Sequence, residues 1–248
     1  MEKKKNDFIA QGSILAIASI LVRVMGMIYR IPMTAIIGDK GNGFYSYAYS
    51  VYTILLLLSS YSLPLAVSKM VSAKAQLGQW RNVKRVFICA IAFAIGIGTT
   101  FGLIVLIGAQ FFTRVFFHSE LAAIALRFMA LSILIMALLG VFRGFFQGLQ
   151  NTLPTAVSQI VEGLINAIMS VVFAYFLFDF GHGMDAAGGT TDLGYAWGAA
   201  GGAIGTGAGA LAGLIFCFIL FVAYRKILAV NISRDKTGTQ QEYGDIFR

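Results

Sequence analysis

The sequence predicts an all-α membrane protein, a polytopic bundle of six transmembrane helices. Apolar residues make up 58% of the 248 residues and charged residues only 12%, whereas a soluble domain carries roughly 25% charge. Six stretches are apolar over the roughly 20 residues that a helix needs to cross a bilayer. No stretch shows the alternation of a strand, and a helix satisfies its own backbone hydrogen bonds in lipid.

The predicted spans follow one another closely along the chain. They cover residues 8–37, 44–72, 84–112, 122–149, 154–178 and 194–224. Two connections are longer: the basic segment 69–84, and the Gly-rich segment 179–193, where we expect Asp185 and Asp192 to be solvated and not to bind calcium. Residues 1–226 then form one transmembrane unit. Residues 227–248 form a polar cytoplasmic linker. Its last six residues, YGDIFR, resemble the start of another element.

The net charge of +8 is distributed along the chain in a way that is typical of a membrane protein. Basic residues flank alternate ends of the spans, which is the positive-inside pattern, so we expect both termini in the cytoplasm of a multi-pass protein. The basic surface then meets anionic lipid headgroups, and nucleic-acid binding is not expected. The Lys-rich start resembles a signal peptide, but its apolar run is too long, which favours an uncleaved first helix.

Two arginines lie inside the first span, well away from both ends. A charge at mid-bilayer costs on the order of 3 kcal/mol, so such residues face protein or a water-filled cavity. Arg23 and Arg30 are seven residues apart and therefore share nearly one helix face. Arg23 lies roughly 22 Å along the helix, about mid-membrane, while Arg30 could also reach the external interface by snorkelling. A guanidinium keeps its charge and grips phosphate bidentately, so the pair is predicted to bind an anion such as a diphosphate.

Polar residues in the fourth and fifth spans are further candidates for lining a cavity. Arg143 and Gln147 share a face near the cytoplasmic end, where Arg143 either anchors at the interface or takes part in gating. Gln159, Glu162 and Asn166 share a face in the fifth span. Glu162 neutralises a cavity arginine as a structural pair, takes up a proton or cation during transport, or belongs to a polar seam with no special role.

Small and aromatic residues predict how the helices pack. Glycines recur at small-xxx-small spacing in the fourth and sixth spans, which allows a neighbouring helix to approach closely. The aromatic residues near span ends are typical of interfacial belts: Tyr45, Tyr47, Tyr49, Tyr52, Trp80 and Trp197. Cys89 and Cys217 lie in apolar spans and are expected to be small core residues.

The sequence contains no recognisable catalytic motif. The sequence has no Gly-rich phosphate loop, paired-aspartate metal motif or histidine cluster. We therefore expect a protein that is not an enzyme and that uses no metal or cofactor, and a membrane transferase ranks last among the alternatives.

Five motifs in order resemble the polysaccharide and lipid-linked oligosaccharide flippases, from about residue 8 to residue 248. They are Arg23-Val-Met-Gly with Tyr-Arg30-Ile-Pro32, Asp39-Lys-Gly-Asn-Gly-Phe-Tyr45, Leu63-Pro-Leu-Ala-Val-Ser-Lys69, Arg143-Gly-Phe-Phe-Gln-Gly-Leu-Gln150 and Pro154-Thr-Ala-Val-Ser-Gln159. The pattern is most similar to the stage V sporulation protein B branch, close to the MurJ-type lipid II flippases. These belong to the multidrug/oligosaccharidyl-lipid/polysaccharide exporter superfamily.

This resemblance implies one lobe of a two-lobed, MATE-like transporter in the bacterial cytoplasmic membrane, with the second lobe after residue 248. It further implies alternating access around a central cavity, with Arg23 and Arg30 holding the diphosphate of an undecaprenyl-linked precursor. The span ILLLLSSYSLP lacks the acid and the arginine that MurJ-type relatives carry there. Lipid II, another undecaprenyl-linked sugar and a spore-cortex precursor therefore all stay open as substrates.

Two other functions are compatible with parts of the sequence. A cation-coupled multidrug exporter would need acids to dominate its pocket, whereas the deep charges here are mostly arginines. A membrane scaffold for envelope assembly would use the glycine ridges for packing, but it gives no reason for Arg23.

Overall fold

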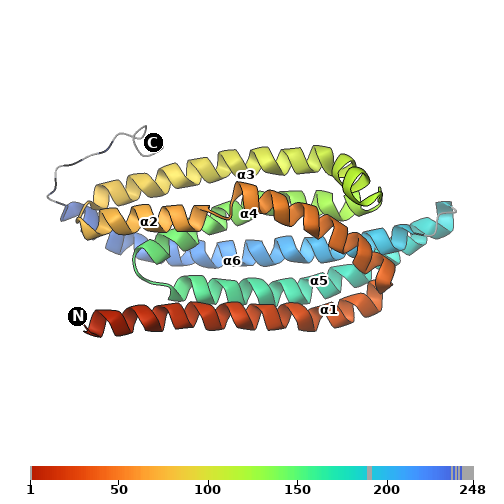
Figure 1. Ribbon diagram of the computed structural model, residues 1–248, viewed down its shortest axis with the longest axis horizontal. Coiled ribbons are helices and arrows are strands. Elements are labelled where there is room, and N and C mark those ends of the chain that lie inside the picture. The colour runs from red at the N-terminus through yellow and green to blue at the C-terminus, as the bar shows by residue number, and fades with distance from the viewer. Residues whose placement is uncertain (1, 189–191, 236, 238, 240, 242–248) are drawn as a thin grey trace.

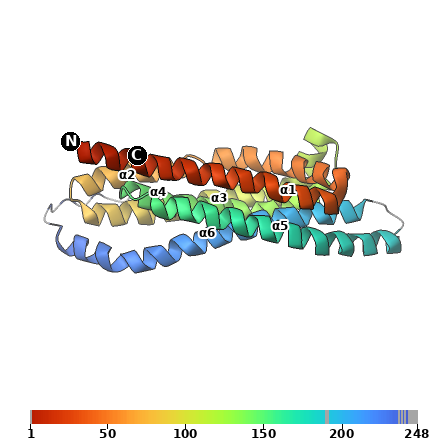
Figure 2. The same ribbon diagram turned by 90° about the horizontal axis from the view of Figure 1, so that it is seen from below.

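The computed structural model describes residues 2–188, 192–235, 237, 239 and 241, and these residues are helical almost throughout, with no strand among them. The helices are α1 (Glu2–Ser59), α2 (Leu63–Gln76), α3 (Trp80–Phe117), α4 (Ala122–Gly148), α5 (Leu153–Gly188) and α6 (Leu193–Ser233). They run side by side along the long axis of an elongated bundle (Figures 1 and 2). The all-α prediction is confirmed for the described residues.

A kink divides α1 into two arms. Gly38 has φ 64° and ψ −179°, a backbone conformation that only glycine adopts readily, so the helix cannot continue straight. Residues 2–37 form the first arm and residues 39–59 the second arm, which runs back from the kink (Figure 1). After a turn at residues 60–62, α2 continues the return path. The predicted boundary between the first two spans therefore coincides with the kink.

Five helical stretches of the described chain are long and apolar enough to cross a membrane. Six spans were predicted. The number is lower here because residues 12–76, which include most of the kinked helix α1 and all of α2, form one continuous stretch. Many large apolar side chains are exposed on the outer surface, among them Ile107, Leu131 and Phe176. A surface of this kind suits contact with lipid acyl chains.

The glycine ridges bring helices into close contact, as their spacing predicts. A Cβ added at Gly201 would lie 2.4 Å from the backbone nitrogen of Ala174, so α6 packs almost backbone to backbone on α5. A Cβ at Gly144 would lie 2.6 Å from the carbonyl oxygen of Pro64, which places α2 against α4 in the same way. The two predicted core cysteines, Cys89 and Cys217, are both buried.

Three segments that were predicted to be loops or linker are partly helical. The segment 179–193 was expected to be a loop, but α5 continues to Gly188. Asp185 was expected to be solvated, but it is only 7% exposed, and its carboxylate accepts hydrogen bonds from the backbone N–H groups of Leu193 (3.0 Å) and Gly194 (2.9 Å). It thereby caps the first turn of α6, where the N–H groups lack partners within the helix.

The other two differences lie at the opposite end of the bundle. The turn within segment 69–84 is limited to residues 77–79, and α6 continues to Ser233, beyond the predicted start of the linker. The carboxylate of Asp235 accepts a hydrogen bond from the backbone N–H of Arg81 (3.0 Å), so the chain after α6 contacts the start of α3. The segment 243–248, predicted to begin another element, lies outside the described residues.

Candidate functional site

A cavity of about 610 Å³ opens between the two arms of α1, and α4, α5 and α6 complete its wall. The first arm contributes both predicted arginines, and the second arm contributes aromatic side chains. The polar and aromatic residues that line the cavity are Arg23, Tyr29, Arg30, Tyr45, Tyr49, Tyr52, Glu162, Asn166 and Thr206. The kink at Gly38 is what brings the two arms to face one cavity.

Arg23 and Arg30 both line this cavity, and both side chains are exposed to it. Within the part of the chain that the structure describes, the ion pairs involve other residues, so neither guanidinium is neutralised by a neighbouring carboxylate. The cavity therefore carries unpaired positive charge, an arrangement suited to an anionic ligand. The binding role of the two arginines stays a prediction.

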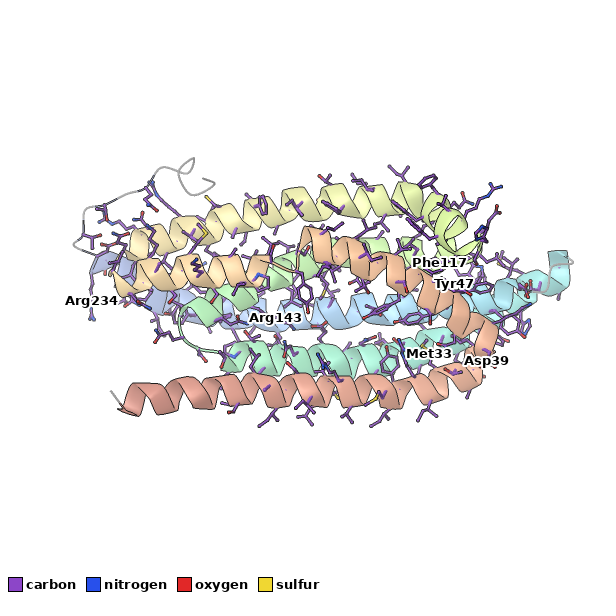
Figure 3. All side chains as sticks on the ribbon, in the orientation of Figure 1. Met33, Asp39, Tyr47, Phe117, Arg143 and Arg234 are labelled. Atoms are coloured by element: carbon purple, nitrogen blue, oxygen red, sulfur yellow. The ribbon has the colours of Figure 1, made fainter. Side chains whose placement is uncertain are left out.

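Glu162 faces the cavity from α5 and is held by an arginine of α4. Its Oε2 lies 2.7 Å from Nη2 of Arg143, and Nε of Arg143 donates a 2.8 Å hydrogen bond to Oγ of Ser158. Figure 3 places Arg143 inside the bundle. Among the predicted roles of Glu162, a structural pair agrees with this geometry, with Arg143 as the partner instead of Arg23 or Arg30. Arg143, predicted either to anchor at the interface or to take part in gating, is 11% exposed and bound to α5.

The remaining polar candidates divide into one that lines the cavity and two that bind neighbouring helices. Asn166 lines the cavity, and its Oδ1 accepts a 2.8 Å hydrogen bond from Ser170. Gln159 instead contacts the first arm, where its Oε1 accepts a 3.5 Å hydrogen bond from Ser19. Gln147 donates a 3.3 Å hydrogen bond to Thr155, which joins the end of α4 to the start of α5.

The tyrosines of the second arm take positions that the sequence did not predict. Tyr45 and Tyr52 are only 1% and 3% exposed and line the cavity, so their assignment to an interfacial belt is wrong. Tyr47 points to the opposite side of the arm and stacks on Phe117, with ring centroids 4.7 Å apart (Figure 3). The signal that could have separated them is helical spacing, because Tyr45, Tyr49 and Tyr52 recur at intervals of four and three.

Arg127 is a further charged residue within an apolar helix, and it was not among the predicted site residues. This residue lies on α4 beside a small apolar crevice of about 150 Å³ between α3 and α4, away from the main cavity. Among the described residues, no three His, Cys, Asp or Glu side chains gather in a group that could hold a metal ion.

Comparison with known proteins places these features in context. The family model described as "Polysaccharide biosynthesis protein" matches residues 8–238. Stage V sporulation protein B of Bacillus subtilis (strain 168) is 26% identical over 228 residues, which covers 92% of this chain and 41% of the relative. Lipid II flippase MurJ of the same organism is 28% identical over 163 residues, which covers 62% of this chain and 30% of the relative.

A third relative from Bacillus subtilis (strain 168), the uncharacterized membrane protein YabM, is 26% identical over 185 residues, covering 74% of this chain and 34% of the relative. The chain thus spans between 30% and 41% of the length of these curated relatives. The relatives and the long apolar helices together identify a multi-pass membrane protein.

Proposed function

This chain belongs to the polysaccharide biosynthesis protein family, and we propose that it forms one lobe of a flippase for a lipid-linked saccharide. The substrate would be an undecaprenyl-linked oligosaccharide or a peptidoglycan precursor such as lipid II, moved across the bacterial cytoplasmic membrane. Two relatives support the proposal by name, since one is a lipid II flippase and the other a stage V sporulation protein.

The observation that carries the proposal is the pair of unneutralised arginines in the cavity. Arg23 and Arg30 line it from one arm of α1. A cation within the span of a membrane is costly unless it faces water or an anion. A diphosphate offers oxygens for two bidentate guanidinium contacts, which makes it the natural occupant of such a site. The polyprenyl tail would remain in the lipid beside the bundle.

The proposed topology has six membrane crossings with both termini in the cytoplasm. The two arms of α1 would cross separately, the second together with α2, because the chain reverses at Gly38. The lysines at the start of the first arm and the basic residues around the α2–α3 turn would then share the cytoplasmic side. Basic residues at the end of α6 lie on that side as well, as the positive-inside rule requires.

The relatives are more than twice as long as this chain, and we propose that a second lobe completes the transporter. The cavity lies open between the arms of α1, so a second lobe would close it from the other side. Rocking of two lobes about a fixed site gives alternating access to the two sides of the membrane. Glu162 and Asn166 would set the polarity of the cavity, while Arg143, Gln147 and Gln159 hold its wall.

A cation-coupled multidrug exporter is less consistent with this cavity. Among the described residues that line the cavity, the carboxylate is that of Glu162, and it is already paired with Arg143. The unpaired charges are positive and would repel a cationic drug.

The test is a flipping assay with the intact protein in proteoliposomes that contain headgroup-labelled lipid II. We expect Arg23→Ala to slow flipping by at least about tenfold, because a charged hydrogen bond contributes about 1.5–3 kcal/mol. Arg114→Ala is the matched control, since Arg114 is exposed and pairs with Glu120 away from the cavity. Normal flipping by a well-expressed Arg23→Ala protein would contradict the proposal, as would a wild-type protein that flips no lipid-linked saccharide.

A further inference from the structure

Three tyrosines form a row along the cavity side of the second arm of α1. The rings of Tyr45 and Tyr49 are stacked, with centroids 5.8 Å apart and an interplanar angle of 18°. Tyr52 follows one turn later, with its centroid 6.0 Å from that of Tyr49 and the rings tilted by 43°. All three line the cavity that Arg23 and Arg30 line from the first arm.

The three rings differ in how much of their surface the cavity can reach. Tyr45 is 1% and Tyr52 3% exposed, whereas Tyr49 is 39% exposed. The hydroxyl of Tyr45 lies 3.3 Å from Oγ1 of Thr206, which fixes that ring against α6. Tyr49 is thus an accessible ring whose orientation is set by two buried neighbours, an arrangement that presents a flat aromatic surface at low cost in side-chain entropy.

An accessible aromatic ring in a polar cavity suits two kinds of ligand. A cation can lie over the ring face, which carries partial negative charge. A pyranose ring can stack its axial C–H groups on the same face, while its hydroxyls bond to nearby polar groups. Arg23 and Arg30 argue against the first kind, because they give the cavity unneutralised positive charge. Asn166 favours the second, because it lines the cavity and its side-chain amide can form hydrogen bonds with hydroxyl groups.

The arms of α1 therefore present two different chemistries to one space. Arg30 lies eight residues before Gly38 and Tyr45 seven residues after it, so charge and aromatic surface occur at similar distances from the kink. A ligand in which a diphosphate is joined directly to a sugar can contact both surfaces. Its diphosphate would meet the arginines and its sugar ring the aromatic side chains.

Resting on the proposed function, we infer that Tyr49, backed by Tyr45 and Tyr52, is the subsite that binds the first sugar of the lipid-linked substrate. The arginines then bind the diphosphate, which all polyprenyl diphosphates share. Tyr49 binds only those lipids that carry a saccharide. The site accordingly prefers a glycosylated carrier to the free carrier lipid.

The experiment compares two probes on the intact protein in detergent: undecaprenyl diphosphate without sugar, and the same lipid carrying N-acetylglucosamine. We expect Tyr49→Leu to bind the glycosylated lipid about tenfold more weakly, a loss typical of an aromatic stacking contact, and to bind the sugar-free lipid as wild type does. Tyr49→Phe keeps the ring and should keep both affinities. Tyr47→Leu is the matched control, because Tyr47 stacks on Phe117 on the other side of the same arm.

A second measurement does not depend on the leucine variant folding. Tyr49→Trp keeps an aromatic ring, and with Trp80 and Trp197 replaced by Phe it supplies a single fluorophore. Its emission should shift on addition of the glycosylated lipid and stay constant with the sugar-free lipid. An equal response to both lipids, or equal loss of both affinities in Tyr49→Leu, would overturn the saccharide subsite while leaving the flippase proposal intact. Failure of the wild-type protein to bind either lipid would instead contradict the proposed function.

Discussion

The guanidinium of Arg143 on α4 and the carboxylate of Glu162 on α5 are joined at 2.7 Å beside the cavity. Their side chains are 11% and 24% exposed, so water screens the pair only weakly. Ser158 accepts a further hydrogen bond from the same guanidinium. The contact links α4 to α5, and it leaves the cavity with the positive charge of Arg23 and Arg30 instead of a balanced set of charges.

Removing one partner of this pair should destabilise the protein. Arg143→Met keeps the length of the side chain but leaves the carboxylate of Glu162 without its partner. We expect a loss of about 3 kcal/mol in the free energy of unfolding, the lower part of the range for a broken buried pair, because Glu162 retains some contact with the cavity. An SDS titration of the purified protein, followed by circular dichroism, measures this loss.

The double variant supplies the control for this prediction. Arg143→Met combined with Glu162→Gln removes both charges, so no unpaired charge remains and most of the lost stability should return. If the losses of the two single variants simply add in the double variant, the pair does not act as a unit and the interpretation is wrong.

The close packing of α6 on α5 gives a second prediction. Gly201→Ala would place a methyl group 2.4 Å from the backbone of Ala174, so the helices must separate. We expect a loss of about 3 kcal/mol, the upper part of the range for overpacking, because backbone atoms cannot move aside as a side chain can. The same SDS titration measures it.

Gly96→Ala is the matched control for this substitution. Gly96 also lies in the middle of a long helix, and a Cβ there meets no atom within 4 Å. Alanine should leave stability unchanged or raise it by up to about 1 kcal/mol, since it favours a helix over glycine. Equal effects at the two positions would mean that helix propensity, and not close packing, governs the result.

Asp235 makes the contact between the end of α6 and the start of α3 dependent on pH. The backbone N–H of Arg81 and both the hydroxyl and the N–H of Thr237 donate hydrogen bonds to its carboxylate, and they lower its pKa from 3.8 to about 2. Because the pKa of Asp235 is lower in the folded state, the contact stabilises the protein fully at pH values above 3.8, the pKa of the unfolded carboxyl group. This stabilisation is lost as the pH falls through about 2. The charged carboxylate also sits favourably at the N-terminus of α3.

Trp80 is a suitable reporter of this change because it begins α3, next to Arg81. In a Trp197→Phe background, its emission should stay constant from pH 6 through 3.8 and change only nearer pH 2. Asp235→Asn should give the changed emission at every pH, because the amide cannot carry the charge. A midpoint at or above the ordinary carboxyl pKa would show that Asp235 is not held by these hydrogen bonds.

Hydropathy and charge predict the all-α membrane class of the fold. The ends of some helices and the contacts between helices depend on packing. The apolar helices, and the presence of Arg23 and Arg30 inside the first of them, follow from where apolar runs lie and where charges interrupt them. The extension of α5 to Gly188 does not, because a Gly-rich polar segment favours a loop by propensity. Contact with α6 overrides that preference: a Cβ at Gly181 would lie 2.7 Å from the carbonyl of Leu193.

The parts of the site that depend on contacts between distant residues were harder to predict. The pairing of Glu162 with Arg143 requires α4 and α5 to meet at a particular register, which spacing within one helix does not fix. The tyrosines were assigned to an interfacial belt because they lie near the predicted start of a span. Tyr45, Tyr49 and Tyr52 line the cavity instead because the kink at Gly38 turns the second arm to face the first.

That kink gives the last prediction. Gly38 has a positive φ of 64° with an extended ψ, a region that residues with a Cβ avoid at a cost of about 1–3 kcal/mol. Gly38→Ala should therefore destabilise the protein by about that amount or change the angle between the arms, although its added methyl group has room beside Tyr195. Gly43→Ala is the matched control, since Gly43 lies five residues later and a Cβ there meets no atom within 4 Å.

The two effects of Gly38→Ala can be separated by spin labels placed on cysteines introduced at Ile17 in the first arm and Leu57 in the second, in a background lacking Cys89 and Cys217. Both positions are exposed on the surface, which suits labelling. If the arms move, the distance distribution measured by double electron–electron resonance shifts in Gly38→Ala and stays as wild type in Gly43→Ala. Because Arg23 and Arg30 lie on the first arm and Tyr49 on the second, a shift should also weaken binding of the glycosylated lipid. Wild-type distances and wild-type stability in Gly38→Ala would show that the kink does not depend on glycine.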